Sequence, residues 1–186
     1  MSADASMPAS EVARVIDAFA QEGITVWVEG GWGVDALLGR VTREHSDLDL
    51  ALDGRNLTAA CQLLEKLGYA AVPGAEPGLP ARILLAGADG AVDLHPLSFD
   101  AHGNGWLQLS DTARSWSCQW REALQATGTV AGRRVACISA RLQMELHMRY
   151  EWRDVDLHDV RMLAEELGLP LPPGATWHTP GPGPAE

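Results

Sequence analysis

Two short motifs near the N-terminus constrain this chain more than any other feature. The first is the pair Gly30-Gly31, which follows a run rich in β-branched and aromatic residues, and the second is the Asp-x-Asp of Asp47 and Asp49. A glycine turn that opens a helix presents bare backbone N–H groups to a phosphate, and two carboxylates on one strand offer oxygen ligands to Mg²⁺. Together the motifs predict a site for a phosphorylated ligand and a metal ion.

Each motif also has an ordinary structural explanation. A lone Asp-x-Asp is usually a solvated strand face or a capping pair, and a glycine pair often only permits a tight turn. The functional interpretation gains support because the motifs are close enough for two adjacent strands to present both at one end. Neither a Walker-type phosphate loop nor a Gly-x-Gly-x-x-Gly motif is present, which disfavours P-loop and dinucleotide-binding folds.

A third carboxylate, Asp93, is expected to join this pair from a neighbouring strand. Apolar residues alternate with it, so Asp93 and His95 would face the site while their neighbours face the core. Clustered carboxylates repel one another unless cations compensate, and two Mg²⁺ ions held by Asp47, Asp49 and Asp93 would do so. Such a site suits nucleotidyl transfer from a triphosphate to an acceptor oxygen, with release of pyrophosphate and with Asp93 as general base.

Composition excludes several kinds of partner. The 186 residues include 14 Lys and Arg against 25 Asp and Glu, a formal net charge of -11. This charge argues against long nucleic acids and weakly favours a small cationic acceptor. Cys61, Cys118 and Cys137 are far apart, so neither a disulfide framework nor a zinc site is indicated. Because no apolar run is long enough to span a bilayer and no basic leader is seen, we expect a soluble, cytoplasmic protein without a membrane partner.

Hydrophobic periodicity predicts an α+β fold, with a mixed β-sheet flanked by helices and a small C-terminal helical part. We assign residues 1–137 to the core, 138–169 to a helical subdomain packed on it, and 170–186 to a flexible Pro/Gly-rich tail. Residues 97–126 show no clear pattern. The expected helices are 11–22 (capped by Ser10 and ended by Gly23), 32–38 (ended by Gly39), 57–67, 139–150 and 156–167. The expected strands are 24–29, 47–52 and 69–72. Two hairpins are also expected, one formed by 82–86 and 91–95 and one across Ala131-Gly132.

Several polar and aromatic residues are open to two interpretations. A second Asp-x-Asp, Asp154 and Asp156, is better explained as helix capping, with Asp156 as the N-cap. Gln143, His147 and Tyr150 share one helical face, where they either line an acceptor pocket or satisfy each other in the core. Four tryptophans either contact ligand, by flanking phosphates or by forming an apolar acceptor wall, or pack in the core: Trp32, Trp106, Trp116 and Trp120.

At these residues the chain resembles the antibiotic nucleotidyltransferases of the DNA polymerase β-like superfamily, most closely the small lincosamide nucleotidyltransferases. Residues 27–35 and 43–49 are similar to that family's signature almost position for position, and 92–96 resembles the segment with its third acidic residue. Residues 137–139 and the helical positions that follow resemble its C-terminal part. The aminoglycoside 2''-nucleotidyltransferases share the first block, but their third-carboxylate segment lacks the His95-Pro96 seen here.

The resemblance implies a nucleotidyltransferase-type fold. It also implies a Mg²⁺-dependent activity that moves AMP from ATP to a hydroxyl of a lincosamide, such as lincomycin or clindamycin, and so confers resistance to the antibiotic. Alternatives left open are an aminoglycoside acceptor, an antitoxin-like or regulatory enzyme that acts on a protein, and assembly as a homodimer. The residues expected at the nucleotide are Gly30, Gly31, Trp32, Arg43 and His45, and those expected near the antibiotic acceptor are Glu29, Arg82, His95 and Trp106.

Overall fold

The structure is a computed structural model that describes residues 6–72, 82–108, 116–119, 121–148, 151–173 and 175. The expectations for the loop 73–80, for the side chains of Trp116 and Trp120, for Tyr150 and for the tail from 176 onward lie outside these residues.

A mixed β-sheet organises the fold and confirms the expected α+β class. Its strands are β1 (Val26–Val28), β2 (Asp47–Asp53), β3 (Ala70–Ala71), β4 (Ile83–Gly87), β5 (Gly90–Phe99), β6 (Gly105–Gln108) and β7 (Trp116–Gln119). The main path runs β1-β2-β5-β4-β3, and β6 pairs with the end of β5 and with β7. The strands β2 and β5 are parallel, whereas the other pairs are antiparallel.

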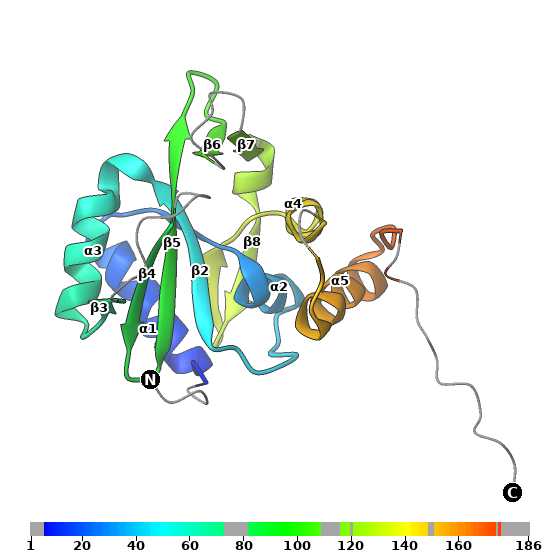
Figure 1. Cartoon of the computed structure of the whole chain (residues 1–186), viewed down its shortest axis with the longest axis horizontal. Helices are drawn as coiled ribbons and strands as arrows, with labels where there is room; N and C mark the ends of the chain where they lie inside the picture. The colour runs from blue at the N-terminus through cyan, green and yellow to red at the C-terminus, as the bar shows by residue number, and fades with distance from the viewer. Residues whose placement is uncertain are drawn as a thin grey trace, which may run out of the picture.

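Helices lie on both sides of this sheet (Figure 1). They are α1 (Ala9–Gln21), α2 (Gly30–Leu38), α3 (Leu57–Lys66), α4 (Ala140–His147) and α5 (Asp154–Leu167), with short 3-10 turns at Gly54–Asn56 and Arg121–Gln125. In Figure 1, α1 and α3 lie to the left of β2, whereas α2, α4 and α5 lie to its right, with α4 above α2. A separate hairpin of β8 (Thr127–Val130) and β9 (Arg133–Ala136) packs beside α2. No helix in the described part of the chain has both the length and the apolar character needed to cross a bilayer.

The alternation along β2 divides the sheet into a core face and a polar face. Leu48, Leu50 and Leu52 are completely buried in the largest hydrophobic cluster, which also contains the inner faces of α1 and α3. Asp47 and Asp49 therefore lie on the opposite face, as a strand period of two requires. The same division holds on β5, so the expected strand faces are confirmed.

Both predicted hairpins are present. The turn between β4 and β5 contains Ala88 and Asp89, and the turn between β8 and β9 contains Ala131 and Gly132. Ala131 and Gly132 have φ values of 48° and 76°, the left-handed conformation that a two-residue hairpin of type I′ demands at both positions. The stretch 97–126 extends β5 to Phe99 and then forms β6, β7 and a 3-10 turn in its described part.

Three predicted helix starts were wrong. The first helix begins at Ala9 after an extended Pro8, so Ser10 lies inside the first turn instead of capping it. The second begins at Gly30, two residues earlier than expected, and the glycines form its first turn. The last begins at Asp154; Asp156 does cap it, but from the third helical position, where its carboxylate accepts from the Arg153 backbone N–H at 2.9 Å.

The close packing of β8 against α2 gives a test of the fold. A Cβ placed on Gly128 would lie 2.3 Å from the Ala36 carbonyl oxygen, and backbone cannot move aside cheaply. We expect Gly128→Ala to lower the free energy of unfolding by about 1 to 3 kcal/mol, measured by urea titration. The exposed Thr129→Ala on the same strand should change it by less than about 0.5 kcal/mol. Equal stabilities for the two variants would contradict this packing.

A buried carboxylate connects α1 to the segment after α3. Glu11 accepts hydrogen bonds from Arg14 Nε at 2.7 Å and from the Tyr69 hydroxyl at 2.6 Å. The Arg14 guanidinium, helped by Tyr69, holds the pKa of Glu11 below its usual range despite burial. Its contribution to stability is therefore present above the unfolded-state pKa and is lost as the pH falls through the folded-state pKa.

Glu11→Gln should lower the free energy of unfolding at pH 7 by about 1 kcal/mol, because Arg14 is half exposed and its charge is screened. This difference from the wild type should shrink when unfolding is repeated at acidic pH, as the pH falls through the lowered folded-state pKa of Glu11 and the wild-type carboxylate becomes protonated. Glu22→Gln, at the exposed end of α1, is the control and should show neither effect. A deficit that is the same at both pH values would argue against an ionised Glu11.

Candidate active site

Parallel pairing brings two of the predicted acidic residues together on the polar face of the sheet. Asp49 on β2 lies directly opposite Asp93 on β5. One ligand atom from each of Asp49, Asp93 and His95 lies within 4.8 Å of the others. Asp93 is only 3% exposed, yet its neighbours Val92 and Leu94 point into the core on the other face. The carboxylate thus sits in a polar cluster and not in hydrophobic interior.

Charged side chains surround this pair. Arg82 Nη2 lies 2.9 Å from Asp93 Oδ2, and His95 Nδ1 lies 2.7 Å from Glu29 Oε2. His95 Nε2 is 3.7 Å from Asp93 Oδ1, a distance that makes the contact electrostatic and not a hydrogen bond. Residues predicted near the acceptor, namely Glu29, Arg82 and His95, therefore lie around Asp93.

The cluster concentrates negative charge in a poorly solvated place. Burial raises the pKa of Asp49 to about 7; the charge of His95 opposes this rise, and the charges of Asp47, Asp93 and Glu29 add to it. Burial by itself lowers the pKa of His95, but Asp93, Glu29 and Asp49 together raise it well above its ordinary value. A bound cation would relieve the same repulsion.

The donor atoms fit a divalent cation. Asp93 Oδ1 is buried without a hydrogen-bond partner among the described residues, so an acceptor oxygen is available beside Asp49. Carboxylate oxygens are the ligands that Mg²⁺ prefers, whereas His95 is a poorer ligand for it. Asp49 and Asp93 can therefore hold Mg²⁺ or Mn²⁺.

Asp47 stands apart from this cluster. It shares the polar face of β2 with Asp49, but it is exposed and lies opposite Ala91. The Ser46 hydroxyl donates to its Oδ1 at 3.3 Å. Asp47 still acts on the site through its charge, which helps to raise the pKa of Asp49.

The two glycines let polar side chains approach the start of α2. Glu29 precedes the helix, and its side chain does not make a capping hydrogen bond to the first turn. Gly30 has a φ of 57°, and a Cβ there would lie 2.1 Å from Asp49 Oδ2. A Cβ on Gly31 would lie 2.3 Å from Arg43 Nη2 and 2.5 Å from His45 Nδ1. The helix start therefore has a carboxylate next to Gly30 and a guanidinium and an imidazole next to Gly31.

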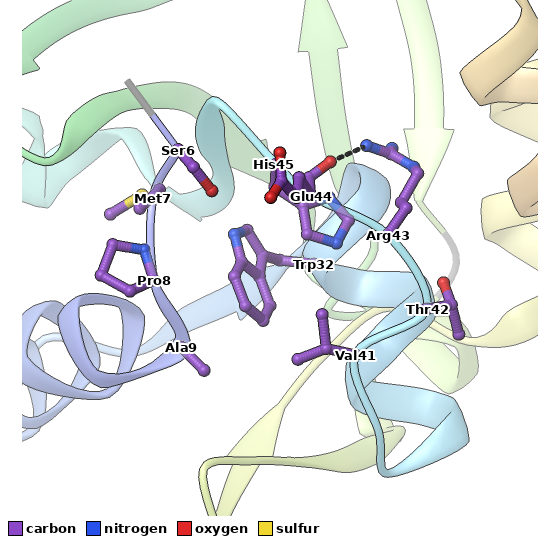
Figure 2. A pocket seen from close by; sticks show the side chains of 10 residues that line it. All are labelled: Ser6, Met7, Pro8, Ala9, Trp32, Val41, Thr42, Arg43, Glu44 and His45. Atoms are coloured by element: carbon purple, nitrogen blue, oxygen red, sulfur yellow. Dashed lines mark hydrogen bonds between the residues drawn. The ribbon is translucent and has the colours of Figure 1, made fainter. Parts of the chain in front are cut away.

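Trp32 lies behind this helix end, beside a cavity of about 340 Å³ (Figure 2). Its ring contacts the His45 ring with centroids 4.5 Å apart, and it belongs to the main hydrophobic core. Figure 2 shows the Arg43 side chain directed away from Trp32, with a hydrogen bond from Nη1 to the Glu44 carbonyl oxygen. The cavity is lined by residues 6–9, Trp32 and 41–45.

The structure does not bring Trp106 to the cluster. It lies on β6 and pairs with Ser98 of β5. Ser98 follows Asp93 by five residues, a distance of about 16 Å along the strand. Its indole N–H donates to Asp100 Oδ2 at 3.1 Å. Any contact of Trp106 with an acceptor would therefore involve a part of the ligand remote from Asp93.

Three buried polar residues lie near the site, and the sequence analysis gave no role to two of them, Asp35 and Asp159. Asp35 lies behind His45, Asp159 lies behind Arg43, and Gln143 Nε2 donates to the Gly30 carbonyl oxygen at 3.3 Å. Gln143 was noticed only as a member of a helix face. Asp35 and Asp159 could have been noticed because each is an acidic residue within an otherwise apolar helix face. A carboxylate buried in such a face needs a cationic or hydrogen-bonding partner.

Comparison with known proteins agrees with this geometry. A lincosamide resistance protein of Staphylococcus haemolyticus is 29% identical over 154 residues, which cover 82% of this chain and 92% of the relative. A 2''-aminoglycoside nucleotidyltransferase of Escherichia coli is 31% identical over 126 residues, 68% of this chain and 64% of the relative.

Solved structures show the same architecture. The lincomycin-bound crystal structure of the lincosamide antibiotic adenylyltransferase LnuA superposes with a TM-score of 0.74 at 26% identity, covering 86% of this chain and 98% of that one. The complex of ANT(2'')-Ia with adenylyl-2''-tobramycin has a TM-score of 0.66 at 23% identity over 86% of this chain and 89% of that one, which supports the fold alone.

The fold and the site define an antibiotic nucleotidyltransferase. A sequence model of the aminoglycoside-2''-adenylyltransferase family matches residues 11–163, and the chain belongs to this family.

The acidic cluster predicts a metal site that two carboxylates control. Asp49→Asn or Asp93→Asn should weaken Mn²⁺ binding at least about 10-fold, measured by electron paramagnetic resonance of free Mn²⁺. Asp53→Asn is the matched control, because Asp53 lies on β2 but is paired with Arg55. Unchanged affinity in both site variants would exclude these carboxylates as ligands.

Proposed function

We propose that this enzyme transfers AMP from Mg-ATP to a hydroxyl group of a lincosamide antibiotic and releases pyrophosphate. The acceptor assignment is carried by the fraction of each relative's own length that this chain matches. In sequence, the lincosamide resistance protein matches this chain over 92% of its own length, whereas the Escherichia coli aminoglycoside enzyme matches over 64%. In structure the difference is smaller, with 98% of the LnuA chain covered against 89% of the ANT(2'')-Ia chain.

Asp49 and Asp93 would hold magnesium in this reaction, and Asp47, on the same face of β2, is the third proposed ligand. Bound Mg²⁺, one ion or two, neutralises charge on the phosphates and on the departing pyrophosphate. The metal ions would be needed because the triphosphate brings more negative charge into an already acidic site.

Asp93 is the proposed general base. The acceptor oxygen forms a bond to the α-phosphorus, the bond from this phosphorus to the bridging oxygen breaks, and the hydroxyl proton passes to Asp93. Arg82 binds Asp93 through Oδ2 and so orients the carboxylate, whose Oδ1 has no hydrogen-bond partner among the described residues. Glu29 holds His95 close to the same oxygen, so both residues would orient the acceptor.

The first turn of α2 is proposed to bind the triphosphate. Backbone N–H groups at a helix start point out of the helix, and the helix dipole favours an anion there. Gly30 and Gly31 keep this end open, and Arg43 and His45 flank it. Trp32 supports His45 from the core side.

The acceptor is proposed to approach from the polar face of the sheet, where Glu29, Arg82 and His95 lie around Asp93, with Trp106 further along. A net charge of -11 favours a cationic antibiotic over an anionic partner. We place the activity in the cytoplasm, where ATP is available and cysteine thiols such as that of Cys61 stay reduced. We also propose that the enzyme forms a homodimer, which a measurement of its mass in solution would test.

One observation favours a second acceptor class, the aminoglycosides. The family whose sequence model matches the chain is named for aminoglycoside adenylylation, and an acidic surface suits these polycations equally well. A protein acceptor is the third candidate. The acceptor assay below separates the two antibiotic classes, and the lack of any small-molecule adduct would favour a protein acceptor.

The wild-type enzyme with Mg-ATP should add one AMP to clindamycin or lincomycin, detected by product mass, and should leave kanamycin and gentamicin unmodified. Asp93→Asn should weaken metal binding and, with Mg²⁺ in excess, should still reduce kcat by about 100-fold or more, because the proposed base is lost. Asp47→Asn should also weaken both metal binding and turnover. Asp53→Asn serves as the control and should keep wild-type turnover. Adducts on aminoglycosides alone, or on no small acceptor, would refute the lincosamide assignment.

A further inference from the structure

A bidentate ion pair connects the loop before β2 to the last helix. Arg43 donates from Nε to Asp159 Oδ1 at 2.8 Å and from Nη2 to Asp159 Oδ2 at 2.6 Å, although 116 residues separate them in sequence. Asp159 is only 1% exposed. Burial opposes its ionisation, but Arg43 and His147 hold the pKa of Asp159 below its usual range. The carboxylate therefore fixes the guanidinium in one orientation.

A second buried carboxylate holds His45 in a similar way. His45 Nε2 lies 2.6 Å from Asp35 Oδ2, and both side chains are buried. The other Asp35 oxygen accepts from the Thr42 backbone N–H at 3.1 Å and from its hydroxyl at 2.6 Å. With Nε2 occupied, the ring can turn only Nδ1 toward Gly31.

Both supported groups face the same helix end. Nη2 of Arg43 and Nδ1 of His45 are the atoms nearest to a Cβ placed on Gly31. A guanidinium beside the N-terminus of a helix is electrostatically unfavourable, since that end carries a partial positive charge. The arrangement becomes favourable when an anion lies between the guanidinium and the helix. Asp159 and Asp35 lie on the far sides of these groups and hold them in place.

We infer that Asp159 and Asp35 are positioning residues for the triphosphate, acting through Arg43 and His45. This inference rests on the proposed function, because it assigns a task to two buried carboxylates behind the same nucleotide site. It also assigns a role to α5, whose Asp159 completes the site from the C-terminal part of the chain.

The test separates KM for Mg-ATP from the other kinetic constants. Asp159→Asn and Asp35→Asn should each raise KM for Mg-ATP by about 10- to 100-fold. Without its carboxylate partner, the side chain of Arg43 or His45 is no longer held in the orientation that contacts the triphosphate. KM for the antibiotic should stay within about 2-fold, since neither residue touches the Asp93 side of the site. Glu166→Gln is the matched control: it breaks the ion pair of Arg40 with Glu166, which joins the same loop to α5 on its exposed side, and should leave KM for Mg-ATP unchanged.

A coupling measurement distinguishes positioning from a purely structural role. If Asp159 acts through Arg43, adding Asp159→Asn to Arg43→Gln should raise KM for Mg-ATP no further. Should Asp159→Asn fail to fold, Arg43→Lys provides the test, because it keeps the charge but cannot make the bidentate contact and should raise KM for Mg-ATP in a folded protein. A lower melting temperature with unchanged KM for Mg-ATP would overturn the inference.

Failure of the proposed function would look different. If the wild type modifies no lincosamide, the dissociation constant of Mg-ATP, measured by calorimetry, replaces KM in every comparison above. Weaker nucleotide binding in Asp159→Asn and Asp35→Asn, with Glu166→Gln unaffected, would then support the inference even though the acceptor assignment had failed. Equal nucleotide affinity in all four proteins would refute it.

Discussion

The parallel pairing of β2 with β5 is the constraint on which the rest of this structure depends. The register places Asp49 opposite Asp93 on one face and Leu50 opposite Leu94 on the other. A shift of one residue would turn the carboxylates into the core and the leucines into solvent, so burial of the leucines also fixes the metal-binding geometry. The hydrophobic core beneath the sheet and the acidic cluster above it are thus two results of one pairing.

The sequence was sufficient to predict features that depend on a short repeat, namely which strand face is buried and where an element ends. Alternation along 47–52 and 91–95 predicted which side chains face the core, and the glycines after α2 and in the β8–β9 turn marked where those elements end, because each occupies a left-handed conformation. The approach of Asp93 to Asp49 followed from the same alternation. Helix starts were harder, since Pro8 and Arg153 precede their helices without being strong capping residues.

Long-range partners were not readable in this way. Nothing local in Arg43 indicates that its carboxylate partner lies 116 residues later, and nothing local in Glu29 indicates its contact with His95. These pairs depend on how α5 and β5 pack, which hydrophobic periodicity does not specify. The position of Asp47 shows the same limit: the strand period placed it on the polar face, but its side-chain direction depends on solvent and charge.

The pair of Arg43 with Asp159 has a consequence for how the protein is made. A ribosome releases the N-terminal segments first, so the sheet and the glycine turn emerge well before residue 159. Until α5 has been synthesised, the guanidinium has no buried carboxylate to hold it, and the phosphate-facing corner stays incomplete. A nascent or prematurely terminated chain would therefore carry the acidic residues of the sheet without the anchored arginine opposite them.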